Sequence, residues 1–89
     1  MPETPNRDQV VEVLCRLAAD RVGCMQAEVT IDTNLFTDLN FDSLDLVEYA
    51  MEIEDEFEVS VSDEQAEGIR TVRNAVDLLL PLLAPSPLG

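Results

Sequence analysis

Apolar residues recur at helical spacing near the start of the chain, between Asn6 and Val22. Because they lie three or four residues apart, they fall on one face of an amphipathic helix. Asn6 or Thr4 is placed to cap the start of this helix, and Gly23 is placed to end it. The apolar face of this first predicted helix consists of Val10, Val11, Leu14, Leu17, Ala18 and Val22.

Residues 24–42 show no sustained period. They contain turn-forming residues such as Asp32, Thr33 and Asn34, together with isolated apolar residues that can anchor a loop. We expect a long, ordered loop, with room for a short helical turn near residues 35–39. Its predicted anchors are Val29, Ile31, Leu35, Phe36, Leu39 and Phe41.

A second helix is predicted from about Ser43 to Phe57, with Asp42 as its cap and Asp45 in its positively polarised first turn. It carries apolar residues on two faces. A surface helix needs only one, so the second stripe is either a set of scattered surface residues or a docking surface. The core stripe holds Leu46, Ala50, Ile53 and Phe57, with Tyr49 at its edge; the second stripe holds Leu44, Val47 and Met51.

The remaining pattern predicts two more helices. Residues 57–61 alternate like a strand but have no second strand to pair with, so we expect an extended connector. Ser62 opens a capping box and a short helix that reaches Gly68. Thr71 can cap a last helix that ends at Leu80, where Pro81 intervenes.

These patterns together predict an all-α protein. We expect a four-helix bundle with three longer helices, one short third helix and a long loop between helices one and two. Residues 1–80 are expected to form one domain. Residues 81–89, a Pro-rich C-terminal tail, are expected to be disordered.

Composition narrows the functional classes. The chain has 89 residues, two cysteines and no histidine. The absence of histidine removes the commonest general base and metal-binding side chain, which argues against a hydrolytic enzyme. Cys15 and Cys24 are too few for a disulfide scaffold or a metal cluster, so we expect free thiols and no bound metal. The N-terminus lacks the features of a signal peptide, which predicts a cytoplasmic protein.

The net charge of −14 is concentrated in the middle of the chain. All five arginines lie outside residues 22–69, and that stretch holds fourteen of the nineteen acidic residues. Such a field repels nucleic acid and anionic membranes and attracts proteins with basic patches. We therefore expect neither nucleic-acid binding nor membrane insertion. The acidity serves either solubility alone or recognition by basic partners.

Ser43 stands at the amino end of the second predicted helix, where free backbone N–H groups and the helix dipole favour a phosphate. A serine beside an aspartate at a helix start is ordinarily a cap. Here Asp42 can provide the cap and leave Ser43 facing solvent. No histidine is present to make Ser43 a catalytic nucleophile, so another protein would have to act on it.

The run DLNFDSLD from Asp38 to Asp45, followed by an acidic helix ending in EDEF, resembles the phosphopantetheine attachment region of acyl carrier proteins. The resemblance covers about residues 7–80 and includes that family's third helix at residues 59–67. It implies a carrier rather than an enzyme. Ser43 would hold a phosphopantetheine arm whose thiol carries acyl or ketide intermediates as thioesters, for fatty-acid or polyketide-type biosynthesis.

The same resemblance implies partners and site residues. A phosphopantetheinyl transferase, the holo synthase, would attach the arm with magnesium, and Asp42 would help at that metal. Other partners would be a ketosynthase and further acyl-processing enzymes with basic patches, acting on a monomeric carrier. The expected partner face consists of Leu44, Asp45, Val47, Glu48, Met51, Glu54 and Asp55.

An acyl chain as cargo can shelter between the helices in such proteins. The resemblance places Ala50, Ile53, Phe57, Val61, Ala66, Ile69 and Ala75 around this pocket. Ordinary core packing explains the same residues equally well.

Four positions depart from the family pattern. Asn40 replaces a frequent glycine, and it can still adopt a left-handed backbone conformation. Phe41 replaces a residue that is often small, Tyr49 an aliphatic one and Glu52 an apolar one. Because these three lie on or near the second helix, we expect them to select particular partners, as in a carrier of a specialised pathway.

Two alternative functions are also compatible with the sequence. A carrier of aminoacyl or peptidyl groups uses the same serine chemistry. An acidic helical adaptor without a prosthetic group would need only the second apolar stripe. A calcium-binding loop is disfavoured, because Asp32-Thr33-Asn34 is not followed by the oxygen ligand and glycine of an EF-hand.

Overall fold

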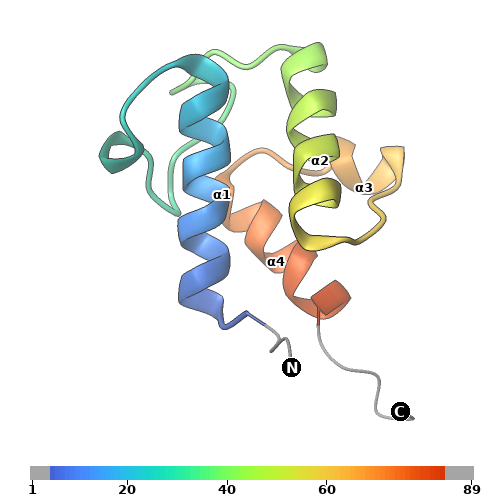
Figure 1. The fold of residues 1–89 in the computed structure, drawn as a ribbon. Helices are drawn as coiled ribbons and strands as arrows, with labels where there is room; N and C mark the ends of the chain where they lie inside the picture. Colours follow the sequence, from blue (N-terminus) through green and yellow to red (C-terminus); the bar gives the residue numbers. More distant parts are fainter. Residues whose placement is uncertain (1–4, 84–89) are drawn as a thin grey trace, which may run out of the picture.

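The computed structural model describes residues 5–83, and within this range the chain is all-α (Figure 1). Three helices are longer, and the third α-helix is short, so the predicted fold class and helix order are confirmed. A short 3-10 helix, which was not predicted, follows the first helix. The elements are α1 (Arg7–Val22), η1 (Gln26–Glu28), α2 (Ser43–Phe57), α3 (Asp63–Glu67) and α4 (Val72–Leu83).

Side-chain caps explain where the first and third helices begin. Asn6 caps α1: its Oδ1 accepts from the backbone N–H of Gln9 at 2.9 Å, and Gln9 Oε1 accepts from the N–H of Asn6. Ser62 and Gln65 form the same reciprocal pair at α3. Gly23, at φ 77°, ends α1 in the left-handed conformation. Of the two predicted caps for α1, Asn6 is therefore the one used.

Helix α4 starts as predicted but ends later. Thr71 Oγ1 accepts from the N–H of Asn74 at 3.1 Å and caps its start. The predicted end at Leu80 is wrong, because the helix continues through Pro81 to Leu83. A proline in the last turn removes only one helical hydrogen bond there, and Leu83 packs against the core. Of the tail expected to be disordered, residues 84–89 lie outside the described residues.

The core is shared by α1, α2, α4 and the long loop. Helix α1 packs against both α2 and α4, and α3 lies beside α2 (Figure 1). Such packing of apolar helix faces around one core supplies most of the stability of a small domain. The largest fully buried side chains are Tyr49, Leu14, Leu35, Ile69, Leu79, Val10, Val72 and Val76.

The loop between α1 and α2 is ordered and anchored, as predicted. Val29, Leu35 and Phe41 are buried in the core. The expected helical turn is a single hydrogen-bonded turn, closed by the N–H of Asp38 on the carbonyl of Asn34 at 2.9 Å. Asn40 adopts φ 59°, a left-handed conformation of the kind that asparagine tolerates.

Backbone hydrogen bonds join this loop to the connection between α3 and α4. The N–H of Leu35 donates to the carbonyl of Arg70 at 2.9 Å, and that of Val72 donates to Thr33 at 3.2 Å. In a third bond, the N–H of Arg73 donates to the carbonyl of Ile31 at 2.9 Å. These bonds hold the loop beside the start of α4, so the segment that leads into α2 has a fixed course.

Candidate functional site

Ser43 is the first residue of α2, and the cap of this helix comes from Asp42. Asp42 Oδ1 accepts from the N–H of Asp45 at 2.8 Å, and Asp45 Oδ2 accepts from the N–H of Asp42 at 3.1 Å. The Ser43 side chain is exposed, and its hydroxyl makes no hydrogen bond within residues 5–83. The division of roles predicted from the sequence is therefore found: Asp42 caps the helix and leaves the serine hydroxyl free.

The start of α2 also presents unpaired backbone donors. The first turn of any helix leaves N–H groups without helical partners. The N–H of Asp45 is capped and that of Leu46 bonds to the carbonyl of Asp42, whereas those of Ser43 and Leu44 have no partner among the described residues. A hydroxyl beside two free N–H groups at the positive end of a helix suits a phosphate ester.

The Asp45 carboxylate is held in its charged form. The backbone N–H of Asp42 donates to it and keeps the pKa of Asp45 below its ordinary value, and the nearby Arg21 guanidinium acts in the same direction. The Asp45 carboxylate is therefore ionised at neutral pH.

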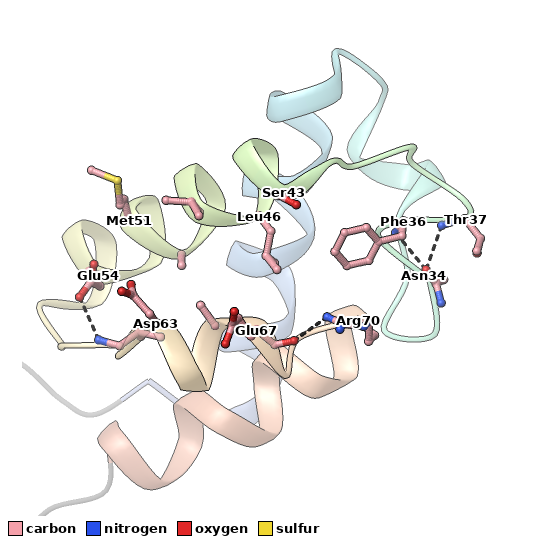
Figure 2. A pocket seen from close by; sticks show the side chains of 14 residues that line it. Asn34, Phe36, Thr37, Ser43, Leu46, Met51, Glu54, Asp63, Glu67 and Arg70 are labelled. Carbon is pink, nitrogen blue, oxygen red and sulfur yellow. Dashed lines mark hydrogen bonds between the residues drawn. The ribbon is translucent and has the colours of Figure 1, made fainter.

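An open groove of about 960 Å³ begins at Ser43 and runs between α2 and α3 (Figure 2). Leu46 points into it from α2, and Phe36 and Arg70 stand on the loop side near Ser43 (Figure 2). Its floor is apolar, while carboxylates stand along its rim. The lining residues are Asn34, Phe36, Thr37, Ser43, Leu46, Val47, Ala50, Met51, Glu54, Val61, Asp63, Ala66, Glu67 and Arg70.

The loop end of the groove is fixed by local contacts. Asn34 Oδ1 accepts from the N–H groups of Phe36 and Thr37, both at 2.9 Å. The Arg70 guanidinium lies 5.2 Å from the centre of the Phe36 ring, a cation–π distance, and donates to the carbonyl of Glu67 at 2.6 Å. These contacts hold Phe36 in place at the wall of the groove.

The seven residues expected around an acyl chain do not stay together. Ala50, Val61 and Ala66 line the groove. The other four do not: Ile53, Ile69 and Ala75 are buried in the core, and Phe57 is half-buried against it. Ile53 and Phe57 of α2, Ile69 of the connection between α3 and α4, and Ala75 of α4 pack in or against the core. The sequence pattern does not distinguish these positions from the groove side.

The second apolar stripe of α2 faces solvent. Leu44, Val47 and Met51 are 65%, 49% and 57% exposed. This exposure is large for three apolar residues on adjacent turns of one helix, and it makes the stripe available to a partner. Of the acidic residues expected beside it, Asp55 is exposed, and Glu54 accepts a hydrogen bond from the N–H of Val61 at 2.9 Å.

The remaining two acidic residues of the expected partner face, Asp45 and Glu48, contact Arg21 of α1. Arg21 Nε lies 3.3 Å from Asp45 Oδ1, and Nη2 lies 2.9 Å from Glu48 Oε2. A third carboxylate, Glu52, lies 3.6 Å from Nη1. Half of the acidic flank that was expected to face partners is therefore already paired within the chain.

Two of the residues expected to select partners are part of the core instead. Phe41 and Tyr49 are both buried, and their rings meet edge to face with centroids 5.6 Å apart. A large ring at one position fills space beside a large ring at the other, so neither ring is available for direct contact with a partner. Glu52 faces Arg21, so it also acts within the chain.

Sequence reasoning missed Arg21, Phe36 and Arg70. Each reaches the site through contacts between residues far apart in the chain, such as Arg21 and Asp45, whose positions differ by 24. The one available signal for Arg21 was its place as a lone cation in the last turn of α1, before a long acidic stretch. Phe36 and Arg70 carried no signal beyond being a loop aromatic and an arginine.

Among residues 5–83, no helix is long and apolar enough to cross a membrane. The same residues contain no cluster of His, Cys, Asp and Glu side chains with the geometry of a metal site.

Comparison with known proteins identifies a matching family model, related sequences and related structures. The family model for the phosphopantetheine attachment site matches residues 12–79. The chain is 41% identical, over 75 residues, to an acyl carrier protein from Rubrobacter xylanophilus, covering 84% of this chain and 93% of that protein. It also resembles a solved structure of the acyl carrier protein from Enterococcus faecalis, with a TM-score of 0.73 and 35% identity, over 88% of this chain and 99% of that one.

Proposed function

This chain belongs to the acyl carrier proteins, and from that premise we propose that Ser43 is the residue that carries its phosphopantetheine arm. The protein is a carrier and not a catalyst. When bound, phosphopantetheine supplies a terminal thiol that holds acyl groups as thioesters. An adaptor without a prosthetic group is not supported, since the matching family is defined by phosphopantetheine attachment.

The observation that carries the proposal is the free hydroxyl of Ser43 at a helix start that another residue caps. Ser62, by contrast, uses its hydroxyl to cap α3, accepting from Gln65 at 3.1 Å. Ser60 lies in the connector between α2 and α3, away from any helix start. Of the described serines, Ser43 alone combines an exposed hydroxyl, free backbone donors and the amino end of a long helix.

Asp42 is proposed to serve two purposes with its two carboxylate oxygens. Oδ1 accepts from the N–H of Asp45 and begins the helix. Oδ2 accepts no hydrogen bond within the described residues, and Asp42 is exposed. That oxygen is available to a magnesium ion held by the transferase, because carboxylate oxygen is a preferred magnesium ligand.

As a member of this family, the protein interacts with a phosphopantetheinyl transferase and with acyl-processing enzymes. We propose that these partners, a ketosynthase among them, dock on the stripe of Leu44, Val47 and Met51 and meet its acidic border with basic patches. An apolar centre with a charged rim is the usual composition of a transient interface. Exposure of the stripe and the charge of −14 support this.

For the cargo, we propose an acyl or ketide chain whose apolar part lies along the groove between α2 and α3. Leu46, Ala50, Val61 and Ala66 form an apolar track in the groove that begins at Ser43. Loading an octanoyl thioester should shift the methyl resonances of Ala50 and Ala66. Unchanged resonances at both residues, in a sample shown by mass to be loaded, would place the chain outside the groove.

The attachment site is tested by intact mass. The protein is incubated with coenzyme A, magnesium and a broad-specificity phosphopantetheinyl transferase, and wild type is compared with Ser43→Ala and Ser60→Ala. We expect one phosphopantetheine adduct on wild type and on Ser60→Ala, and none on Ser43→Ala. An adduct that persists on Ser43→Ala, or its absence from wild type, would contradict the proposal.

A further inference from the structure

Arg21 contacts three carboxylates on one flank of α2 through three different nitrogens. Its Nε, Nη2 and Nη1 atoms lie 3.3 Å from Asp45, 2.9 Å from Glu48 and 3.6 Å from Glu52. The three acids are three and four residues apart, so they line the side of the helix that faces α1. The Arg21 side chain is 21% exposed. One guanidinium therefore spans about two turns of α2.

This cluster is short of positive charge. One guanidinium faces three carboxylates, and each carboxylate receives a single contact from it rather than a bidentate pair. Glu52 Oε2 is buried and accepts no hydrogen bond within the described residues; its only ionic contact is the one at 3.6 Å. The cluster keeps an excess of two negative charges, so its carboxylates can accept another cation.

The cluster borders the proposed docking stripe. Asp45 and Glu48 follow Leu44 and Val47 directly in the sequence of α2, and both carboxylates are partly open to solvent. A partner that covers the stripe and offers an arginine or lysine to this flank meets carboxylates that Arg21 already holds. Its cation must share them with Arg21 or displace it. Such displacement is feasible because ion pairs that remain partly open to solvent are weak.

We propose that Arg21 is a specificity-determining residue: an internal competitor that lowers the attraction of the Asp45–Glu48–Glu52 flank for a partner's cations. This rests on the proposed function. A partner with only one or two cations gains little binding free energy on this flank. A partner with a larger basic patch can replace Arg21 and neutralise the excess negative charge. Arg21 thereby favours strongly basic partners over weakly basic ones.

The chain offers a matched control on the same helix. Arg16 of α1 pairs with a single carboxylate, Glu56, near the other end of α2, and both side chains are exposed. Arg16→Gln and Arg21→Gln change the net charge by the same amount. Of the two arginines, only Arg21 contacts the acids that adjoin the stripe, so the two variants separate local competition from overall charge.

The experiment measures the rate of adduct formation by intact mass, using coenzyme A and a broad-specificity phosphopantetheinyl transferase at low and high salt. We expect Arg21→Gln to raise kcat/KM about two- to fivefold at low salt, and the gain to disappear at high salt, because screening weakens exposed charges. Arg16→Gln should stay close to wild type. Arg21→Lys, which keeps the charge but cannot reach three carboxylates at once, should lie between wild type and Arg21→Gln.

A double-mutant cycle separates competition from a purely structural role. If Arg21 competes for Glu48, Glu48→Gln should reduce the rate more in the Arg21→Gln background than in wild type. Equal effects in both backgrounds, or a fall in rate for Arg21→Gln and Arg21→Lys alike, would show that Arg21 only joins α1 to α2. Absence of any adduct on wild type would contradict the proposed function and this inference with it, whereas an adduct with unchanged rate ratios would contradict this inference alone.

Discussion

The hydroxyl of Tyr49 donates to the backbone carbonyl of Leu14 at 3.0 Å and so joins α2 to α1 inside the core. Tyr49 is fully buried, and Phe41 packs edge to face against its ring. The aromatic pair therefore sets how α2 and the end of the loop pack on α1. Its influence on partners can only be indirect, through the position of α2.

The buried hydroxyl predicts a loss of stability at alkaline pH. Burial raises the pKa of Tyr49 above its ordinary value of 10.0, whereas the unfolded chain releases this proton near pH 10. Above that pH the folded state binds more protons than the unfolded state, so the free energy of unfolding falls as pH rises. Tyr49 is the only tyrosine. We expect its tyrosinate absorbance to appear together with unfolding measured by circular dichroism.

The control for this prediction is Tyr49→Phe, which keeps the ring and removes the hydroxyl. It should cost about 1 kcal/mol of stability through the lost hydrogen bond. It should also reduce the loss of stability at alkaline pH. The loss that remains is due to Cys15, whose thiol pKa is likewise raised by burial. A tyrosinate signal near pH 10 in the folded wild type would contradict the prediction.

Asp42 should contribute to stability as a cap, apart from any part in attachment. Asp42→Ala removes the acceptor for the N–H of Asp45 and should lower the free energy of unfolding by about 1 kcal/mol in urea titrations. Asp42→Asn keeps a capping oxygen and should stay near wild type in stability. If the free oxygen of Asp42 also serves the transferase's magnesium, Asp42→Asn should still lose modification rate. Equal modification rates for Asp42→Asn and wild type would show that Asp42 does not serve the transferase's magnesium.

A stabilising substitution is predicted at the end of α2. Glu58 caps this helix with φ 55° and ψ 49°, a left-handed conformation that disfavours residues with a Cβ atom. Glu58→Gly should raise the free energy of unfolding by about 0.5–1 kcal/mol. Glu58→Ala removes the same charge but keeps the Cβ atom. If both variants gain equally in thermal melts, the effect comes from charge at the helix end and not from the backbone.

The docking stripe predicts a separation of folding from recognition. Met51→Glu places a charge in the stripe, at a side chain that is mostly exposed, so stability should change by no more than about 0.5 kcal/mol. The rate of modification by the transferase should fall by about tenfold, a size typical of a central interface residue. Leu82→Glu alters an exposed apolar residue of α4 and serves as the control. Similar modification rates for the two variants would show that the stripe is not a docking surface.

Much of the fold was predictable because its signals are local. The bounds of α2, the cap at Asp42 and the capping box at Ser62 all follow from residues within a few positions of one another. The end of α4 was predicted at Leu80 but lies at Leu83. A proline signals a break, but packing of Leu83 outweighs the loss of one hydrogen bond in a last turn.

The site was predictable only in part, for the same reason. Ser43 and the exposed stripe lie on one helix, so periodicity places them together. The groove forms only where Phe36 and Arg70, which are distant in the sequence, come close to α2 in the fold. Helical spacing also does not show which apolar residues of α2 line the groove and which, like Ile53, are buried in the core. Pairing of Arg21 with Asp45 likewise depends on how α1 packs on α2.

The hydrogen bonds between the long loop and the start of α4 have a consequence for local unfolding. The amides of Leu35, Val72 and Arg73 are each held by a carbonyl on the other segment, so neither segment can open without freeing the other. In hydrogen exchange these amides should therefore share one opening free energy and behave as a single cooperative unit. The loop that leads to Ser43 would then open as rarely as the start of α4 to which it is joined. The proposed phosphopantetheine arm would move while the backbone at its attachment point stays ordered.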